Sequence, residues 1–160
     1  MCGICGIVSS APLAGGDAAS VRRMNEALLH RGPDGGGDHA DTHAMVAMRR
    51  LSIIDLDGGW QPFRSQPWAL ALVVNGEIYN YPELRRDLEA RGHRFRTDSD
   101  CETILHLYEE RGVDCVHALR GMFAFALWDG RKRRLVLGRD RMGEKPLYLY
   151  EAGRTLVFAS

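Results

Sequence analysis

The segment Met122-Phe-Ala-Phe-Ala-Leu-Trp128 is followed by Asp129-Gly130 and then, after three basic residues, by Arg134-Leu-Val-Leu-Gly138. Two short apolar runs on either side of an Asp-Gly pair predict an antiparallel β-hairpin. The pattern repeats downstream, where Leu147–Tyr150 and Thr155–Ala159 flank a turn at Ala152-Gly153. The last quarter of the chain is therefore predicted to form consecutive antiparallel strands.

Upstream of this segment, strands and helices alternate in blocks. Short apolar runs predict strands at Gly3–Val8, Ala44–Met48, Leu51–Ile54 and Ala69–Val74. Apolar periodicity and end signals predict helices at Asp17–Leu29 and Pro82–Ala90, a third from Ser99 to Gly112, and a short helical piece at Val113–Leu119. The glycine-rich stretch Arg31–Gly37 is predicted to be a loop. Helices grouped between two runs of strands indicate an α+β fold with largely antiparallel sheets.

Composition limits the classes of protein that remain. The chain has 160 residues, enough for one domain, with 45% hydrophobic and 26% charged residues. Lys plus Arg and Asp plus Glu both total 21, and this balance argues against nucleic-acid binding. The longest apolar run, Trp68–Val74, is too short to span a membrane, and the N-terminus lacks a secretory signal. We therefore expect a cytoplasmic protein with reduced thiols.

Two of the four cysteines, Cys2 and Cys5, form a C-x-x-C motif. A zinc site would need a second close pair of ligands, and Cys101 and Cys115 lie too far apart in the sequence to supply one. None of the six histidines has the spacing typical of metal ligands, so no metal is expected. A zinc or redox role for the C-x-x-C pair remains the alternative to a catalytic role for Cys2.

Cys2 is the strongest candidate for a nucleophile. Removal of Met1 makes it the N-terminal residue, and its own α-amine, with a pKa of about 7.7–8, can then accept the thiol proton. A small buried cysteine near the start of the chain is the plainer reading of this residue alone. The rest of the sequence decides between the two.

Eight blocks along the chain match one family in order. They are Met-Cys-Gly-Ile at 1–4, His-Arg-Gly-Pro-Asp at 30–34, Arg-Leu-Ser-Ile-Ile-Asp at 50–55, Gln-Pro at 61–62, Val-Asn-Gly-Glu-Ile-Tyr-Asn at 74–80, Ser-Asp-Cys-Glu at 99–102, Gly-Met-Phe-Ala-Phe-Ala at 121–126 and Gly-Arg-Asp-Arg-x-Gly-x-Lys-Pro-Leu-Tyr at 138–148. The chain resembles the glutaminase domains of class II glutamine amidotransferases, the N-terminal-nucleophile kind, and among them those of asparagine synthetases. Met48 and Trp60 depart from the family pattern, where a histidine and a smaller residue are expected.

The resemblance implies a fold and a reaction. The fold is the four-layer sandwich of N-terminal-nucleophile hydrolases, two antiparallel sheets flanked by helices, over residues 1–160. The reaction is hydrolysis of L-glutamine to glutamate and ammonia through a thioester on Cys2. By the same resemblance, the Asn75 side-chain amide and the Gly76 backbone N–H stabilise the oxyanion. Taken alone, Asn75-Gly76 favours a two-residue hairpin turn.

The resemblance also implies how free glutamine is bound. Arg50 matches the residue that binds the α-carboxylate, and Asp100, assisted by Glu77, matches the one that receives the ammonium group. The backbone of Leu51, Ser52, Ile53 and Ile54 is expected to line the same pocket. The plainer alternatives are a solvated Arg50 and an Asp100 that only complements a helix dipole.

No phosphate-binding G-x-x-x-x-G-K-[ST] loop and no Ser-Gly-Gly-x-Asp-Ser loop occur in the chain. We therefore expect no cofactor in this domain, and ATP and Mg only in a C-terminal synthetase domain that is absent from this chain. That domain would use the ammonia for ATP-dependent asparagine synthesis from aspartate; a homodimer is compatible with this organisation. The alternatives are a glutaminase domain serving another acceptor and a catalytically silent interaction domain. Four charged residues near the end of the chain are expected to face a following domain or water: Arg139, Asp140, Arg141 and Lys145.

Overall fold

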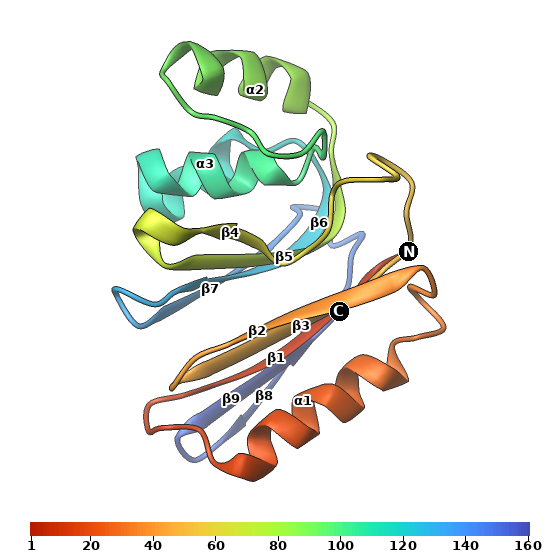
Figure 1. Cartoon of the computed structure of the whole chain (residues 1–160), viewed down its shortest axis with the longest axis vertical. Coiled ribbons are helices and arrows are strands. Elements are labelled where there is room, and N and C mark those ends of the chain that lie inside the picture. The colour runs from red at the N-terminus through yellow and green to blue at the C-terminus, as the bar shows by residue number, and fades with distance from the viewer.

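The computed structural model describes residues 1–160 and contains two antiparallel β-sheets that lie face to face (Figure 1). The first sheet has the order β2-β3-β1-β9-β8, formed by β1 (Gly3–Ser9), β2 (Gly35–Ala40), β3 (Ala44–Arg50), β8 (Tyr148–Ala152) and β9 (Thr155–Ala159). The second has the order β4-β5-β6-β7, formed by β4 (Phe63–Ser65), β5 (Leu70–Ile78), β6 (Gly121–Asp129) and β7 (Arg134–Arg139). The predicted α+β class, with hairpins at β6–β7 and β8–β9, is confirmed.

Helices cover the outer face of each sheet. Helix α1 (Gly15–Ala27) packs on the first sheet, and α3 (Glu102–Arg111) packs on the second, with α2 (Tyr81–Ala90) lying against α3 (Figure 1). Two short 3₁₀ helices, η1 (Gln66–Trp68) and η2 (Gly112–Ala118), complete the fold. The result is the predicted four-layer order of helix, sheet, sheet and helix. None of these helices has the length and apolar character needed to cross a membrane.

Each interface between layers has its own apolar cluster, because successive residues of a strand point to opposite faces. The cluster under α1 contains Cys5, Ile7, Val21, Met45 and Ala47. The cluster between the sheets contains Ile4, Val46, Met48, Ala71, Val73, Ala126 and Phe158. The largest cluster, between the second sheet and α3, includes Leu72, Val74, Ile104, Leu107 and Phe125. Odd and even positions of β1 and β5 thus face different layers.

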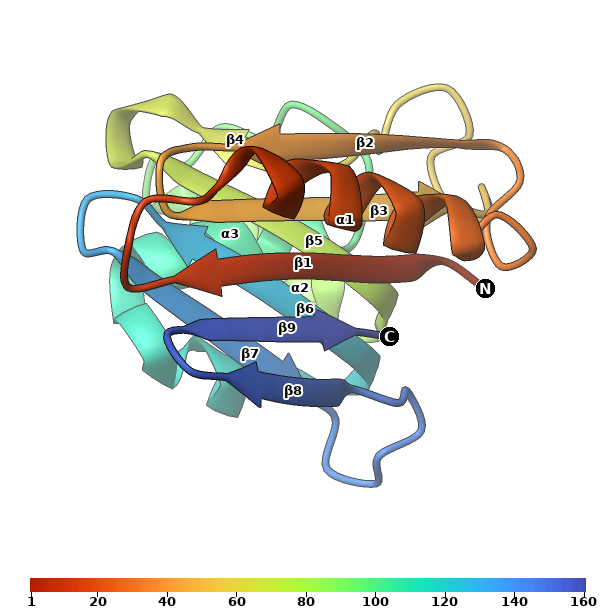
Figure 2. The same ribbon diagram turned by 90° about the horizontal axis from the view of Figure 1, so that it is seen from below.

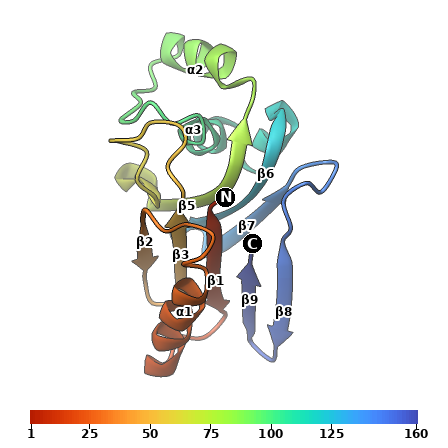
Figure 3. The same ribbon diagram turned by 90° about the vertical axis from the view of Figure 1, so that its right-hand side faces the viewer.

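Strand β1 lies in the middle of the first sheet, between β3 and β9 (Figure 2). Its register pairs Gly3 with Arg49 of β3, and the N–H of Ile4 donates to the carbonyl of Ser160 at 3.1 Å. The two ends of the chain therefore lie close together (Figure 3). This register also brings Cys2 beside the end of β3, where Arg50 closes the strand and Leu51 follows.

The structure corrects the predicted end of the strand at Val74 and the interpretation of Asn75-Gly76 as a turn. Strand β5 runs without a break to Ile78 and pairs with β6 over its whole length. Gly76 is needed here for space, because a Cβ atom at this position would lie 2.2 Å from the carbonyl oxygen of Met122. Asn75-Gly76 is thus part of a long strand and not a hairpin turn.

Two further predictions of secondary structure are wrong. Leu51–Ile54 is irregular and forms no strand, because the loop that follows β3 turns its carbonyl groups toward the Arg50 side chain. Gly35–Gly37, predicted within a loop, opens β2 and pairs with β3. Glycine is needed at position 37 of this strand, because a Cβ atom there would lie 2.2 Å from the carbonyl oxygen of Gln61.

The start of α3 also differs from its prediction. The helix begins at Glu102, and Ser99 contributes its backbone carbonyl to the Glu102 N–H instead of a side-chain cap. The Glu102 carboxylate accepts hydrogen bonds from the N–H groups of Arg96 and Thr97, both at 2.9 Å. Asp100 therefore lies just before the helix, in the loop that leads into it.

Candidate active site

A cavity of about 330 Å³ opens where the N-terminus, the loop after β3, the end of β5 and the loop before α3 meet. Its size is within the range of small-molecule sites. Its lining comprises Met1, Cys2, Arg50, Leu51, Ile53, Ile54, Gly59, Gln61, Val74, Asn75, Gly76, Glu77, Ser99, Asp100, Cys101, Met122 and Lys145. Of the predicted site residues, Ser52 alone is not in the lining; its backbone N–H donates to Asp34 Oδ2 at 2.7 Å.

The half-buried Cys2 sulfur lies against the backbone of Leu51. The Leu51 N–H donates to Sγ at 3.4 Å, and the thiol donates to the Leu51 carbonyl at 3.6 Å. These two contacts fix the position of the sulfur at the wall of the cavity. The Arg31 side chain holds the same residue from the other side, because its Nε donates to the Cys2 carbonyl oxygen at 3.2 Å.

The second cysteine of the C-x-x-C motif points elsewhere. Cys5 is fully buried in the cluster under α1, whereas Cys2 packs at the edge of the cluster between the sheets. Burial raises the pKa of the Cys5 thiol to about 12, against the opposing effect of Arg49. The two thiols face opposite sides of the first sheet, so the alternative of a shared zinc ion or a disulfide between them is wrong.

Strand β5 brings two predicted oxyanion donors to the cavity. Asn75 points toward the first sheet, where its Nδ2 donates one hydrogen bond to Ser160 Oγ at 3.0 Å and keeps a second N–H. The Tyr79 N–H donates to Arg120 at 2.7 Å, which sets the odd-numbered N–H groups of β5 toward β6. The N–H of Gly76, an even-numbered residue, therefore points to the opposite edge of the strand.

Two neighbouring N–H groups confirm that the even-numbered N–H groups of β5 point to this edge. The Val74 N–H donates to Gln61 Oε1, and the Ile78 N–H donates to Asp100 Oδ2, both at 2.6 Å. The Gly76 N–H lies between these two, on the edge that lines the cavity. Asn75 and Gly76 thus offer a side-chain donor and a backbone donor to one space.

Arg50 is buried at the cavity wall, with only 3% of its surface exposed. Its guanidinium group donates to the carbonyl oxygens of Ile54 at 3.2 Å and Gly58 at 2.9 Å, and it also contacts those of Asp55 and Leu56. Trp60, whose ring centre lies 5.0 Å from the guanidinium carbon, stacks on it. Arg50 therefore holds the loop that carries Ile53 and Ile54, a role that the sequence did not predict.

Asp100 provides a buried carboxyl group to the lining of the same cavity. Only 3% of the residue is exposed, and burial raises its pKa above the ordinary value, against the opposing effect of the Ile78 N–H. Glu77 is half-buried and lines the same cavity. Two carboxyl groups on the wall suit a ligand that carries an ammonium group.

A family model described as a glutamine amidotransferase domain matches residues 1–160, the whole chain. This chain belongs to the glutamine amidotransferase domain family. The amidotransferase domain is 44% identical over 162 residues to "Asparagine synthetase [glutamine-hydrolyzing] 2" of Bacillus subtilis, and the match covers 100% of this chain and 21% of that protein. It is 44% identical over 149 residues to "Asparagine synthetase B [glutamine-hydrolyzing]" of Escherichia coli, covering 90% of the chain and 27% of that protein.

The same fold occurs in solved structures. Glutamine phosphoribosylpyrophosphate amidotransferase from B. subtilis superposes with a TM-score of 0.78 at 23% identity, over 98% of this chain and 41% of the other. This likeness confirms the N-terminal-nucleophile type of fold for the amidotransferase domain. The chain spans roughly a quarter of the length of the curated relatives it matches, from 21% to 28%.

Lys145 and Asp140 are residues of the amidotransferase domain whose position the sequence did not predict. Both are buried, although we expected them to face a following domain or water. Burial tends to raise the pKa of Asp140, but the N–H groups of Lys145, Glu144 and Phe123 donate to it and lower that pKa. Asp140 thereby fixes the turn that places Lys145 Nζ in the cavity, 2.9 Å from Met1 Sδ. Their place in the block at 138–148 was the only signal available.

Proposed function

We propose that this amidotransferase domain hydrolyses L-glutamine to glutamate and ammonia through a thioester on Cys2. The observation that supports this most is the convergence of four distant segments on one cavity. Cys2 comes from the N-terminus, Arg50 from the end of β3, Asn75 and Gly76 from β5, and Asp100 from the loop before α3. Nucleophile, charged side chains and oxyanion donors are the groups that hydrolysis of free glutamine requires.

The first step is attack by sulfur on the side-chain carbonyl carbon of glutamine. Once Met1 is removed, the α-amine of Cys2 accepts the thiol proton, directly or through water. The carbonyl oxygen becomes an oxyanion, and the Asn75 Nδ2 and Gly76 N–H donate to it. Each such donor contributes on the order of 3 kcal/mol to lowering the barrier.

The second step releases ammonia and then glutamate. The α-amine of Cys2 passes its proton to the side-chain amide nitrogen of glutamine. The carbon–nitrogen bond then breaks, ammonia leaves, and the acyl group remains on sulfur as a thioester. A water molecule, deprotonated by the same amine, attacks the thioester carbon. The carbon–sulfur bond breaks, glutamate leaves, and the thiol regains its proton.

The acceptor of the ammonia is the second part of the proposal. The named relatives are glutamine-hydrolysing asparagine synthetases, of which this chain covers about a quarter of the length. We therefore propose that the whole protein passes ammonia to a C-terminal synthetase domain for ATP-dependent formation of asparagine from aspartate in the cytoplasm. A shielded path suits this transfer, since only neutral ammonia is a nucleophile.

The direct test of the proposal is an assay of the purified chain with free L-glutamine. We expect release of glutamate and ammonia in equal amounts, and none from N-acetylglutamine, which has no ammonium group for Asp100 to bind. Absence of glutamate from a folded chain with Met1 removed would contradict the proposed function. Addition of aspartate and ATP to the whole protein tests the acceptor separately.

Replacing Arg50 by lysine should weaken glutamine binding. Lysine keeps the charge but cannot direct a planar fork of N–H groups at several oxygens, whether of the loop or of a carboxylate. We expect the KM for glutamine to rise at least about tenfold, as hydrogen bonds to charged groups contribute about 1.5–3 kcal/mol each. Arg49→Lys is the matched control, because Arg49 donates to Asn25 at 3.2 Å outside the cavity. An unchanged KM in Arg50→Lys would show that Arg50 does not serve binding.

Glutamine binding should weaken on the acid side at a higher pH than an ordinary aspartate would cause. Burial raises the pKa of Asp100, so its carboxylate takes up a proton before the pH falls to the ordinary value, and the neutral acid cannot pair with an ammonium group. Below the raised pKa, the Kd should increase by about tenfold per pH unit; above it, the Kd should be constant. Calorimetric binding of glutamine to Cys2→Ala, which cannot turn over, measures this. Asp100→Asn should bind glutamine weakly at every pH tested. If the Kd of that variant still increased at low pH in the same way, the titrating group would be a residue other than Asp100.

A further inference from the structure

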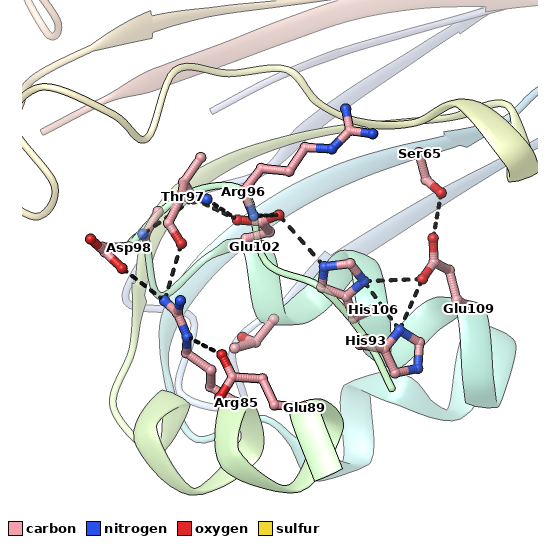
Figure 4. A network of polar contacts seen from close by, with 12 residues as sticks. Ser65, Arg85, Glu89, His93, Arg96, Thr97, Asp98, Glu102, His106 and Glu109 are labelled. Carbon is pink, nitrogen blue, oxygen red and sulfur yellow. Dashed lines mark hydrogen bonds and ion pairs between the residues drawn. The ribbon is translucent and has the colours of Figure 1, made fainter. Parts of the chain in front are cut away.

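A cluster of two histidines and three glutamates lies around α3, outside the cavity described above. Figure 4 shows four of its members, His93, His106, Glu102 and Glu109. His106, Glu109 and Glu110 are on α3, Glu102 is its first residue, and His93 lies just after α2. The side chains of His93, His106 and Glu109 are 17%, 10% and 9% exposed. The glutaminase reaction proposed above uses none of them.

Three atoms of this cluster face one another at short range. Nδ1 of His93 lies 3.3 Å from Nδ1 of His106, and these atoms lie 3.2 Å and 3.0 Å from Oε2 of Glu109. Zn²⁺ binds nitrogen and oxygen ligands at about 2.0–2.2 Å, which places two ligand atoms of a tetrahedron roughly 3.3 Å apart. The triangle therefore already has the spacing of three ligands around one metal ion.

A carboxylate or a hydroxyl group lies near the outer atom of each of these side chains, although Nε2 of His106 itself makes no hydrogen bond. Nε2 of His93 lies 3.1 Å from Glu110 Oε1, and Nε2 of His106 lies 3.5 Å from Glu102 Oε1. Ser65 Oγ donates to the second oxygen of Glu109 (Figure 4). Metal-binding histidines commonly pair their other ring nitrogen with a carboxylate, which fixes the tautomer and leaves the facing nitrogen free to bind metal.

We propose that His93, His106 and Glu109 bind a divalent transition-metal ion of the Zn²⁺ type. Two imidazole nitrogens and one carboxylate oxygen suit zinc, whereas Mg²⁺ and Ca²⁺ prefer sites made of oxygen alone. His93 is the most exposed of the three, so water can fill the remaining position from that side. The ion would join the segment after α2 to α3 and act as a structural link.

Protonation of His106 is the arrangement that competes with the metal. Burial would lower the pKa of His106, but the neighbouring carboxylates of Glu102 and Glu109 raise it to about 9. A protonated His106 bridges the two carboxylates without any ion. The experiment must therefore separate a metal ligand from a purely internal ion bridge.

Titration of the chelator-treated protein with ZnCl₂ by calorimetry at pH 8 tests the proposal. We expect one ion per chain and a rise in Tm in the presence of ZnCl₂. His93→Gln should weaken binding at least about tenfold and remove the Tm rise, because it loses one of the three ligands. His117→Gln is the matched control, since the His117 side chain is 77% exposed and lies on η2. A Cys2→Ser background removes the accessible thiol of the cavity as a rival zinc ligand.

Two additional measurements keep the outcome decisive. Glu110→Gln retains all three ligands but loses the negative charge beside His93 Nε2 and the surface ion pair with Arg91. Affinity should therefore fall about 10–100-fold, while the metal-free Tm changes little. Co²⁺ bound to the parent protein, in which His93, His106, Glu109 and Glu110 are unchanged, should show no thiolate-to-cobalt charge-transfer band, because no cysteine belongs to the proposed site. Absence of stoichiometric binding by the parent, or equal affinity in His93→Gln and the parent, would overturn the proposal and leave His106 as an internal bridge.

Discussion

Cys2→Ala will lose glutamine hydrolysis and keep the fold. The variant retains the cavity, the two proposed oxyanion donors and the carboxyl groups, but it has no atom that can form the proposed thioester. Removing a nucleophile lowers kcat by about 10⁴-fold or more in enzymes of this kind. The side chain of Cys2 is half-buried at the edge of an apolar cluster, so its truncation costs little stability. Glutamate release and thermal unfolding, measured on the same preparation, check both parts.

Cys5→Ala is the matched control for this experiment. The Cys5 thiol is fully buried under α1, its weak contact is with the Val21 carbonyl at 3.9 Å, and its pKa is raised to about 12. We expect its loss to lower the free energy of unfolding by about 1 kcal/mol and to leave kcat unchanged. Glutaminase activity that persists in Cys2→Ala, or disappears in a folded Cys5→Ala, would contradict the assignment of Cys2 as the nucleophile.

Retention of Met1 will abolish activity to a similar degree. With Met1 in place, the nitrogen of Cys2 is an amide that cannot accept the thiol proton, and the proposed general base of the reaction is lost. Met1 also lines the cavity and contacts Lys145, so it occupies part of the space beside the sulfur. A form in which a specific protease cleaves directly before Cys2 allows the same preparation to be assayed before and after cleavage.

The expected result is no glutamate release before cleavage and full release after it. Intact mass gives the fraction of chains that begin at Cys2, and activity should be proportional to that fraction. A Cys2→Ala variant with the same cleavable N-terminal extension controls for the protease. It should be inactive both before and after cleavage. Equal activity before and after cleavage would remove the α-amine from the mechanism.

Local sequence patterns predicted most of the strands and helices of this domain. The hairpins at β6–β7 and β8–β9 and the helices α1, α2 and α3 follow from apolar spacing and turn residues. The errors occurred where tertiary contacts override those patterns. Asn75-Gly76 has the chemistry of a turn but lies inside β5, because β6 pairs with it along its whole length.

The candidate site was predicted residue by residue from family motifs, and all of its members except Ser52 line one cavity. Two properties of that site could not be predicted from motifs. The direction of the Gly76 N–H depends on which N–H groups of β5 pair with β6. The contacts of Arg50 depend on the path of the loop over residues 54–58. The cluster of His93, His106 and Glu109 likewise shows no metal-binding spacing in the sequence.

By itself the sequence determined the fold class, most of the elements and the family, since apolar periodicity, turn residues and ordered motifs are local properties of the chain. Only the tertiary structure decided which face of the first sheet each thiol occupies, which donors reach the cavity and which histidines meet. These depend on strand register and helix packing, in which residues distant in the sequence come together. A shift of one residue in register would turn Cys2 and Asn75 away from their present neighbours, although the local pattern would be unchanged.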